Sequence, residues 1–168
     1  MSDPSSSIYR VISTHDFAEI RQKISNEQNA LFSLRAYNTG DVVADFSAGT
    51  ISEEPTYLTV QVGTNRHITL QPTFLQYIDH SCDPNVFFDT TAMKLVALKN
   101  ISAEEEFSFF YPSAEWKMTQ SFNCYCGSPK CIGENKGASF LSAEQVSQYR
   151  FTDYIQEQLS KEQKKRVA

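Results

Sequence analysis

Four cysteines are the residues of this chain whose type and spacing most plainly suggest chemistry. Cys124, Cys126 and Cys131 form a C-x-C-x4-C cluster, and Cys82 stands alone inside the stretch Gln76–Asn85, which reads QYIDHSCDPN. A structural zinc ion takes four tetrahedral ligands, so a cluster of three thiolates needs one more from elsewhere in the chain. We therefore expect Cys82 to complete a closed zinc site and to join the C-terminal cluster to this stretch.

The spacing alone leaves other uses of the thiols open: two disulfides, four unligated buried thiols, or the zinc site of an interaction domain without Cys82. The chain opens with the polar residues MSDPSSS, has no segment resembling a signal peptide, and has no apolar run of membrane-spanning length. We expect an intracellular protein, cytoplasmic or nuclear. In those compartments reduced thiols favour metal binding over disulfides.

Length and composition predict one globular domain. The chain has 168 residues, of which 40% are hydrophobic, with 12 Phe and 8 Tyr. A net charge of −5 argues against a nucleic-acid partner, which would be held mainly by phosphate contacts. No G-x-G-x-x-G or P-loop sequence is present, so a Rossmann-type methyltransferase or nucleotide-binding protein would lack its phosphate-cradling element.

Hydrophobic periodicity predicts a mostly β fold with a few helices that positions these residues. Short strands are expected at 8–12, on both sides of a turn at 38–41, and at 57–62, 66–70, 86–88, 95–98 and 107–111. A helix is expected to begin at Ser13–Asp16, because Phe17, Ile20 and Ile24 have helical spacing. A second helix is expected over 142–165, opening with a capping box at Ser142.

Three motifs together resemble the SET-domain protein-lysine methyltransferases. HSCDPN is similar to that family's asparagine-histidine-serine-cysteine signature, EEEFSFFY (Glu104–Tyr111) to its acidic turn and catalytic strand, and NCYCGSPKCIG (Asn123–Gly133) to its post-SET zinc motif. They occur in the family's order, and the resemblance covers about residues 28–133. It implies short curved β-sheets of a β-clip-like kind, a pseudoknot-like thread through the turn at Asp79–Asn85, and a C-terminal helix.

The resemblance also implies domain boundaries and partners. It divides the chain into a disordered tail (1–8), a SET domain (9–111), a post-SET zinc-binding segment (112–137) and a C-terminal helix (138–168). The implied cofactors are S-adenosylmethionine and Zn²⁺, with Cys82, Cys124, Cys126 and Cys131 as the zinc ligands. The implied partner is a protein or peptide that carries a lysine; neither nucleic acid nor a membrane is expected, and the sequence does not give the oligomeric state.

The implied cofactor-binding residues are Asn29, Ala30, Leu31, Asp79 and His80. The segment QNALF (28–32) stands where the family has Gly-x-Gly-Leu-Phe, so both glycines are absent here. Asp79 replaces the family's asparagine. Its carboxylate could attract the positive groups of the cofactor or repel the cofactor's carboxylate, and the sequence leaves both outcomes open.

Tyr111 is the implied catalytic residue, because it matches the tyrosine whose hydroxyl orients the acceptor nitrogen. Phe109 matches the position that limits product methylation, and a phenylalanine there implies that more than one methyl can be added. Phe110 replaces an aspartate common in the family. Phe122 and Tyr125 are expected to form walls of the channel for cofactor and lysine.

The absent glycines, Asp79 and Phe110 also support an alternative function. In that alternative the chain is a non-catalytic SET-like module that binds a peptide or protein partner.

Overall fold

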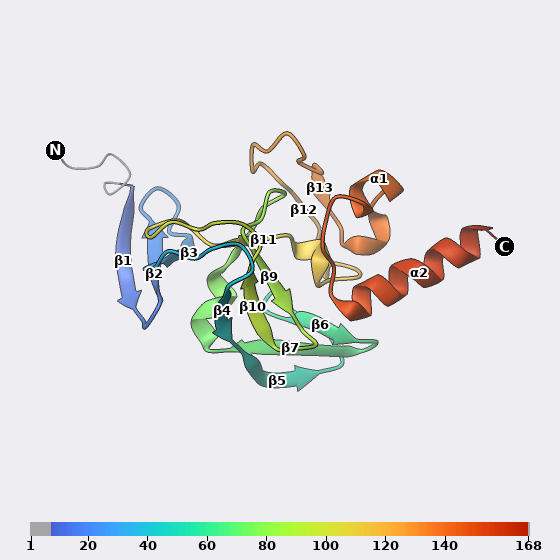
Figure 1. The fold of residues 1–168 in the computed structure, drawn as a ribbon, viewed down its shortest axis with the longest axis horizontal. Coiled ribbons are helices and arrows are strands. Elements are labelled where there is room, and N and C mark those ends of the chain that lie inside the picture. Colours follow the sequence, from blue (N-terminus) through green and yellow to red (C-terminus); the bar gives the residue numbers. More distant parts are fainter. Residues whose placement is uncertain (1–7, 168) are drawn as a thin grey trace.

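The computed structural model describes residues 8–167 and shows mostly short strands, with two α-helices toward the C-terminal end (Figure 1). The predicted mostly β fold class is confirmed. The expected disordered tail (1–8) lies outside the described residues except for Ile8, which is in a turn. Among the described residues, neither helix combines the length and the apolar character that a membrane crossing requires.

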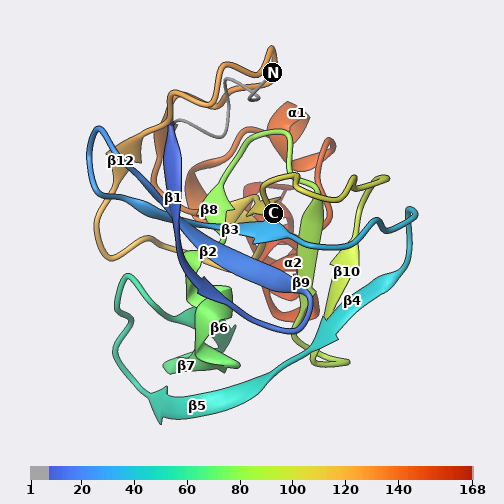
Figure 2. The same cartoon turned by 90° about the vertical axis from the view of Figure 1, so that its left-hand side faces the viewer.

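The N-terminal part is a three-stranded antiparallel sheet rather than the strand and helix that we expected. β1 (Tyr9–Thr14), β2 (Ala18–Lys23) and β3 (Asn29–Ser33) pair in that order (Figure 2). The helix predicted from Ser13–Asp16 is wrong. Ala18 and Ile20 are buried with a period of two, whereas Ile24 is 58% exposed, so the apolar spacing came from a strand followed by a turn.

Two further three-stranded sheets form the middle of the molecule. One has the order β4-β10-β9 and the other the order β5-β7-β6. The strand pair on either side of Asn65 is confirmed as a hairpin, although its first strand begins at Val60, three residues later than expected. The bounds are β4 (Val42–Asp45), β5 (Ser47–Ser52), β6 (Val60–Gly63), β7 (Arg66–Gln71), β9 (Val86–Asp89) and β10 (Lys94–Ala97).

A short parallel pair joins two segments that lie far apart in the sequence. β8 (Asp79–His80) pairs with β11 (Ser108–Phe109), in the register Ser108 with Asp79 and Phe109 with His80. The buried side chain of Asn85 strengthens the pairing: its Nδ2 donates to the Glu106 carbonyl (2.8 Å) and its Oδ1 accepts from the Ser108 N–H (2.8 Å). The signature turn is therefore fixed against the strand that leads to Tyr111.

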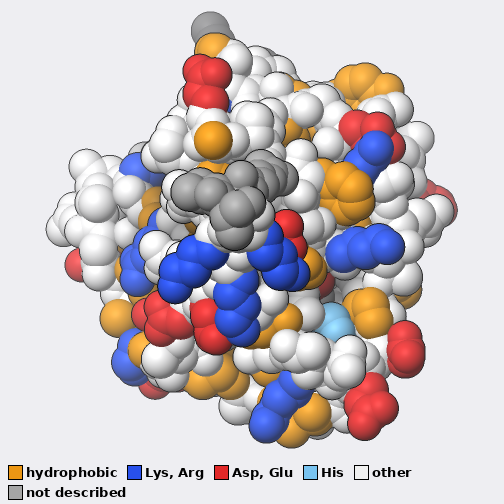
Figure 3. Space-filling view, turned by 90° about the vertical axis from the view of Figure 1, so that its right-hand side faces the viewer, with side chains coloured by type: hydrophobic (Ala, Val, Ile, Leu, Met, Phe, Trp, Pro, Cys, Tyr) orange, Lys and Arg blue, Asp and Glu red, His pale blue; other side chains and the backbone are white. Residues whose placement is uncertain are grey.

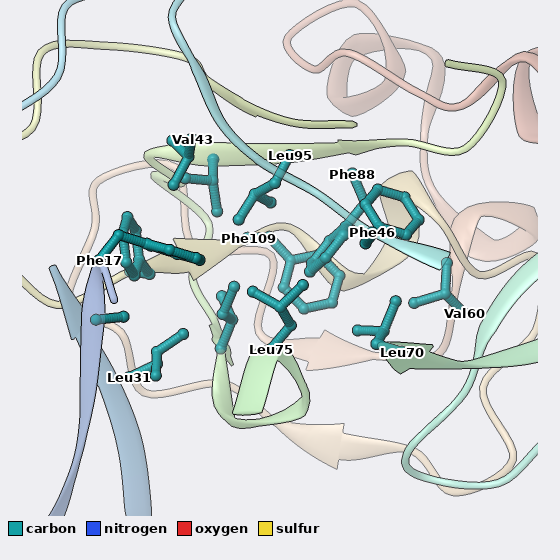
Figure 4. Close-up of a cluster of buried hydrophobic side chains, with 14 of the residues drawn as sticks. Phe17, Leu31, Val43, Phe46, Val60, Leu70, Leu75, Phe88, Leu95 and Phe109 are labelled. Atoms are coloured by element: carbon teal, nitrogen blue, oxygen red, sulfur yellow. The ribbon is translucent and has the colours of Figure 1, made fainter. Parts of the chain in front are cut away.

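The main hydrophobic core includes Phe109, a residue of β11. Phe88 is fully buried, with its ring centroid 5.4 Å from that of Phe46 and 4.8 Å from that of Phe109 (Figure 4). Burying a Phe side chain contributes roughly 1.5–3 kcal/mol. Since Phe109 belongs to this core, the backbone around Tyr111 is held by packing as well as by hydrogen bonds.

The C-terminal helix is broken into two. α1 (Ala143–Val146) and α2 (Asp153–Val167) replace the single helix expected over 142–165, although the capping box at Ser142 is confirmed. The chain leaves the helical path because Phe151 and Thr152 are buried against the body of the molecule. The Thr152 N–H also donates to the Ser113 carbonyl (2.9 Å). Tertiary packing thus overrides local helix propensity here.

The far end of α2 points away from the body of the molecule (Figure 1). Basic and acidic side chains are interspersed on that face (Figure 3), and Lys161 pairs with Glu157 (3.2 Å) one helical turn away.

The remaining elements are the 3₁₀ turns η2 (Thr73–Tyr77), η3 (Tyr111–Ser113) and η4 (Ala138–Phe140), and the antiparallel pair β12 (Phe122–Asn123) and β13 (Glu134–Asn135).

Candidate functional site

The four cysteines converge in space, as the sequence predicted. All four are free thiols, and their sulfurs lie within 4.8 Å of one another. The Sγ atoms of Cys82 and Cys124 are 3.8 Å apart. Two sulfurs bound to one tetrahedral zinc ion at about 2.3 Å each are about 3.8 Å apart, so this donor set fits zinc and its spacing does not fit disulfides.

Backbone groups hold the cysteine cluster in shape. The Cys124 N–H donates to the Gly133 carbonyl (2.7 Å), and the Ile132 N–H donates to the Cys82 sulfur (3.4 Å). Gly133 has a φ of +77°, which a residue with a side chain rarely adopts, and this turn returns the chain to the cluster. Tyr149, in the segment between the two helices, donates its hydroxyl to the Cys82 carbonyl (2.8 Å).

Burial alone would keep the inner thiols protonated. It raises the pKa of Cys82 and, to about 11, that of Cys124. A bound dication supplies the positive charge that lets buried thiols ionise, and coordination deprotonates a thiol outright. The cluster is therefore chemically suited to a structural zinc ion with all four positions filled by sulfur.

His80 connects this cluster to Tyr111. The Tyr111 N–H donates to His80 Nδ1 (3.1 Å), so Nδ1 carries no proton and the neutral ring has its proton on Nε2. Nε2 lies 3.4 Å from the Cys82 sulfur, close enough to donate to it. Burial lowers the pKa of His80 to about 4, which keeps the ring neutral. The imidazole thus lies between a predicted zinc ligand, Cys82, and the backbone of the predicted catalytic residue.

Tyr111 lies among aromatic rings at the start of η3. Its ring centroid is 4.6 Å from that of Phe109, 5.1 Å from that of His80 and 5.8 Å from that of Phe122. Burial and the Asp79 charge raise the pKa of its hydroxyl, which therefore stays protonated. Phe122 thus lies beside Tyr111 as expected, but Tyr125 is 88% exposed, so the expectation that it forms a channel wall is wrong for this structure.

A narrow cavity of about 40 Å³ opens beside Tyr111. Phe109 and Tyr111 line one part of it, and residues 57–60, before and at the start of β6, line another. Glu115 also lines this cavity, and the sequence analysis missed it. The available signal was a lone acid inside PSAEW, a segment otherwise made of small residues and tryptophan.

Backbone pairing joins β3, which holds the predicted cofactor residues Asn29, Ala30 and Leu31, to the segment just before β11. Phe32 forms a bridge with Glu106, and the Phe107 N–H donates to the Leu31 carbonyl (2.9 Å). Ala30 and Leu31 are buried, and the buried Oδ1 of Asn29 has no hydrogen-bond partner.

Asp79 faces Glu106, a residue that we read from sequence only as part of a solvated acidic turn. Desolvation raises the pKa of Asp79 to about 6, although a hydrogen bond with Glu106 opposes the shift. Desolvation and the charge of Asp79 raise the pKa of Glu106 to about 7. The structure thus places a pair of weakly acidic carboxyl groups beside the β3 segment.

Comparisons with known proteins agree with this geometry. The family model described as the SET domain matches residues 8–112. A methyltransferase of Aspergillus flavus, flvH, is 33% identical over 133 residues, which is 78% of this chain and 74% of that protein. The chain therefore belongs to the SET domain family, and its relatives are named as methyltransferases.

More distant relatives are large proteins. A histone-lysine N-methyltransferase of Candida albicans, H3 lysine-36 specific, is 40% identical over 63 residues, and its counterpart in Saccharomyces cerevisiae is 26% identical over 114 residues. These matches span 7% and 15% of the respective proteins. The methyltransferase domain of human SETMAR superimposes with a TM-score of 0.45 and 18% identity, over 74% of this chain and 56% of that chain.

Removing the metal should destabilise the protein strongly. Because a structural zinc ion contributes its binding energy to folding, we expect chelation to lower the free energy of unfolding by at least about 3 kcal/mol, or roughly 10 °C in Tm. Thermal unfolding of zinc-loaded, chelated and reloaded protein measures this. An unchanged Tm after complete metal removal would contradict a structural zinc site.

The acidic pair should make stability fall as pH rises from about 4 to about 7. A carboxyl whose folded pKa is raised costs nothing below its unfolded pKa of about 4.3, and its cost grows until the pH reaches the folded pKa, about 7 for Glu106, and is constant above it. Glu106→Gln should therefore raise Tm near pH 8 and leave it nearly unchanged near pH 4. Exposed Glu53 provides the matched control, Glu53→Gln. Equal shifts for both variants would refute the pairing.

Proposed function

We propose that this protein transfers a methyl group from S-adenosylmethionine to the ε-amine of a protein lysine. The observation that carries the proposal is the position of Tyr111. Its ring lies among Phe109, His80 and Phe122, beside a cavity of about 40 Å³. Membership of the SET domain family supports methyl transfer, and the relatives named as histone-lysine methyltransferases support a lysine as the acceptor.

The residues around β3 fit the cofactor. S-adenosylmethionine carries an ammonium and a sulfonium, and the buried, unpaired Oδ1 of Asn29 and the Asp79–Glu106 carboxyls offer acceptors and negative charge. Ala30 and Leu31 would contribute backbone groups, and His80 would border the adenine. When bound, the cofactor supplies the methyl group.

In-line methyl transfer depends mainly on alignment, which a well-ordered site can supply at a gain of several orders of magnitude. The protonated hydroxyl of Tyr111 would orient the acceptor nitrogen, and the Phe109 ring would set the space next to it. The hydrogen bond from the Tyr111 N–H to His80 holds this arrangement while the rings exclude water. Cys82, Cys124, Cys126 and Cys131 would hold zinc for architecture alone, since no ligand position is left for water.

A lysine of a histone is the first substrate class to test, because two of the relatives are named as H3 lysine-36 specific. Such a substrate would agree with nuclear residence, and a cytoplasmic protein substrate is the other possibility.

The competing function is a non-catalytic module that binds a peptide. The absent glycines, at Gln28 and Ala30, favour it. Phe110 does not, because it stacks on Tyr149 (centroids 3.7 Å apart) and so has a packing role.

Cofactor binding and Tyr111→Phe together test the proposal. We expect one-to-one binding of S-adenosylmethionine by calorimetry in both proteins, and a rate of methyl transfer at least about 100-fold lower in the variant, because only the orienting hydroxyl is lost. Phe87→Tyr, at a buried position away from the cavity, is a control for altered aromatic packing. No cofactor binding at millimolar concentration would favour the non-catalytic module.

Phe109→Tyr should reduce the number of methyl groups added. Phe109 is buried at the cavity wall, and an added hydroxyl there would occupy space that a methylated amine needs. Mass spectrometry of product peptides should shift toward monomethyl-lysine, with the first methylation slowed by less than about tenfold. An unchanged product distribution would show that Phe109 does not limit this site.

A further inference from the structure

Glu115 is a buried carboxylic acid on the wall of the cavity that holds Phe109 and Tyr111. Its exposed fraction is 7%, and it lies two residues beyond the end of η3, four residues after Tyr111. Acids are almost never buried this deeply without a partner. Neither the zinc cluster nor the cofactor residues account for its presence at this position.

The backbone on both sides of Glu115 is fixed. The Ala138 N–H donates to the Glu115 carbonyl (2.9 Å), and the Trp116 N–H donates to Oε1 of the buried Gln61 (3.0 Å). The Gln61 N–H in turn donates to the Ala114 carbonyl (3.1 Å). Since Gln61 belongs to β6, whose first residue lines the cavity, these bonds hold Glu115 in a set position relative to the cavity.

The cavity gives Glu115 no counter-charge of its own. Burial is the sole cause that raises its pKa, to about 8, and no charged neighbour contributes. Among the residues lining the cavity, the other titratable groups are Tyr57, which is 90% exposed, and Tyr111, which stays protonated. A cation that enters the cavity would therefore be the first charge to face this carboxyl.

A lysine side chain enters such a cavity as an ammonium and must become a neutral amine before it can attack a methyl group. We propose that Glu115 accepts the proton that the substrate's ε-ammonium loses, an assignment that rests on the proposed lysine methyltransferase function. An N–H bond of the ammonium breaks and an O–H bond forms on the carboxylate. The freed lone pair then attacks the methyl carbon, and the C–S bond breaks with its electron pair going to sulfur.

The raised pKa makes this transfer feasible. An ordinary lysine has a pKa of about 10.4 and an ordinary glutamate a pKa of about 4.3, which is a difference of roughly six orders of magnitude in proton affinity. Such a glutamate would be a poor proton acceptor. With Glu115 at about 8, roughly two orders remain. Desolvation of the ammonium narrows this gap, and the attraction between the ammonium and the carboxylate widens it.

The test compares Glu115→Gln with the wild type on a degenerate peptide pool that has one fixed lysine and random flanking residues. Near pH 7.5 we expect the variant to be about 100-fold slower, the usual contribution of a positioned base. Its rate should keep rising at alkaline pH, where the wild-type rate levels off, so that the deficit shrinks at least about tenfold by pH 9.5. Glu53→Gln is the control for an exposed acid, and zinc content and cofactor binding should match in all three proteins. The Tm of Glu115→Gln near pH 7.5 should be at least that of the wild type, because its neutral amide replaces an acid whose pKa burial raises.

A second pool separates proton transfer from a packing defect. In it the fixed residue is aminoethylcysteine, whose amine is less basic than that of lysine, and this pool should restore much of the variant's activity near pH 7.5. If Glu115→Gln is slower than the wild type by a factor that is the same at every pH and for both acceptor amines, the assignment is overturned. Equal methyl-transfer rates for the variant and the wild type would also overturn it. An inactive wild type would instead overturn the proposed function, and the assignment with it.

Discussion

The contact between Cys82 and the C-terminal cysteines is the constraint on which the rest of the site depends. The Cys82 sulfur lies 3.8 Å from the sulfur of Cys124, which is 42 residues away in the sequence. Two residues before Cys82, His80 accepts a hydrogen bond from the Tyr111 N–H. The cysteine cluster, the signature turn and the strand that leads to Tyr111 are thus joined within one short segment. Displacing Cys82 would loosen all three at once.

Chemistry at the site depends on electrostatic conditions that this packing creates. The same low exposure keeps His80 neutral, keeps Tyr111 protonated, and makes Glu115 a stronger base than an ordinary glutamate. Each effect favours the neutral form of a group, as expected where water is largely excluded. A site of this kind binds a cation only through the few acids that it retains, and in this chain those acids lie at Glu115 and at the Asp79–Glu106 pair.

The sequence predicted the parts of this site whose chemistry is local. The cysteine spacing predicted that the four thiols converge, and HSCDPN predicted the signature turn, because both depend on residue types a few positions apart. It failed where tertiary contacts decide. Phe17 and Ile20 suggested a helix but belong to a β-hairpin, and Phe151 breaks the C-terminal helix because it is buried against the body. The role of Glu115 depends on a cavity formed by distant segments, which no local pattern reveals.

The most direct test of the central claim is X-ray absorption at the zinc edge of the purified, zinc-loaded protein and of Cys82→Ser. The account predicts four sulfur ligands at about 2.3 Å in the wild type, and three sulfurs with one nitrogen or oxygen in the variant. Three or fewer sulfurs in the wild type, or an unchanged spectrum in the variant, would show that Cys82 is not a ligand. The zinc cluster and the Tyr111 site would then be separate features of the fold.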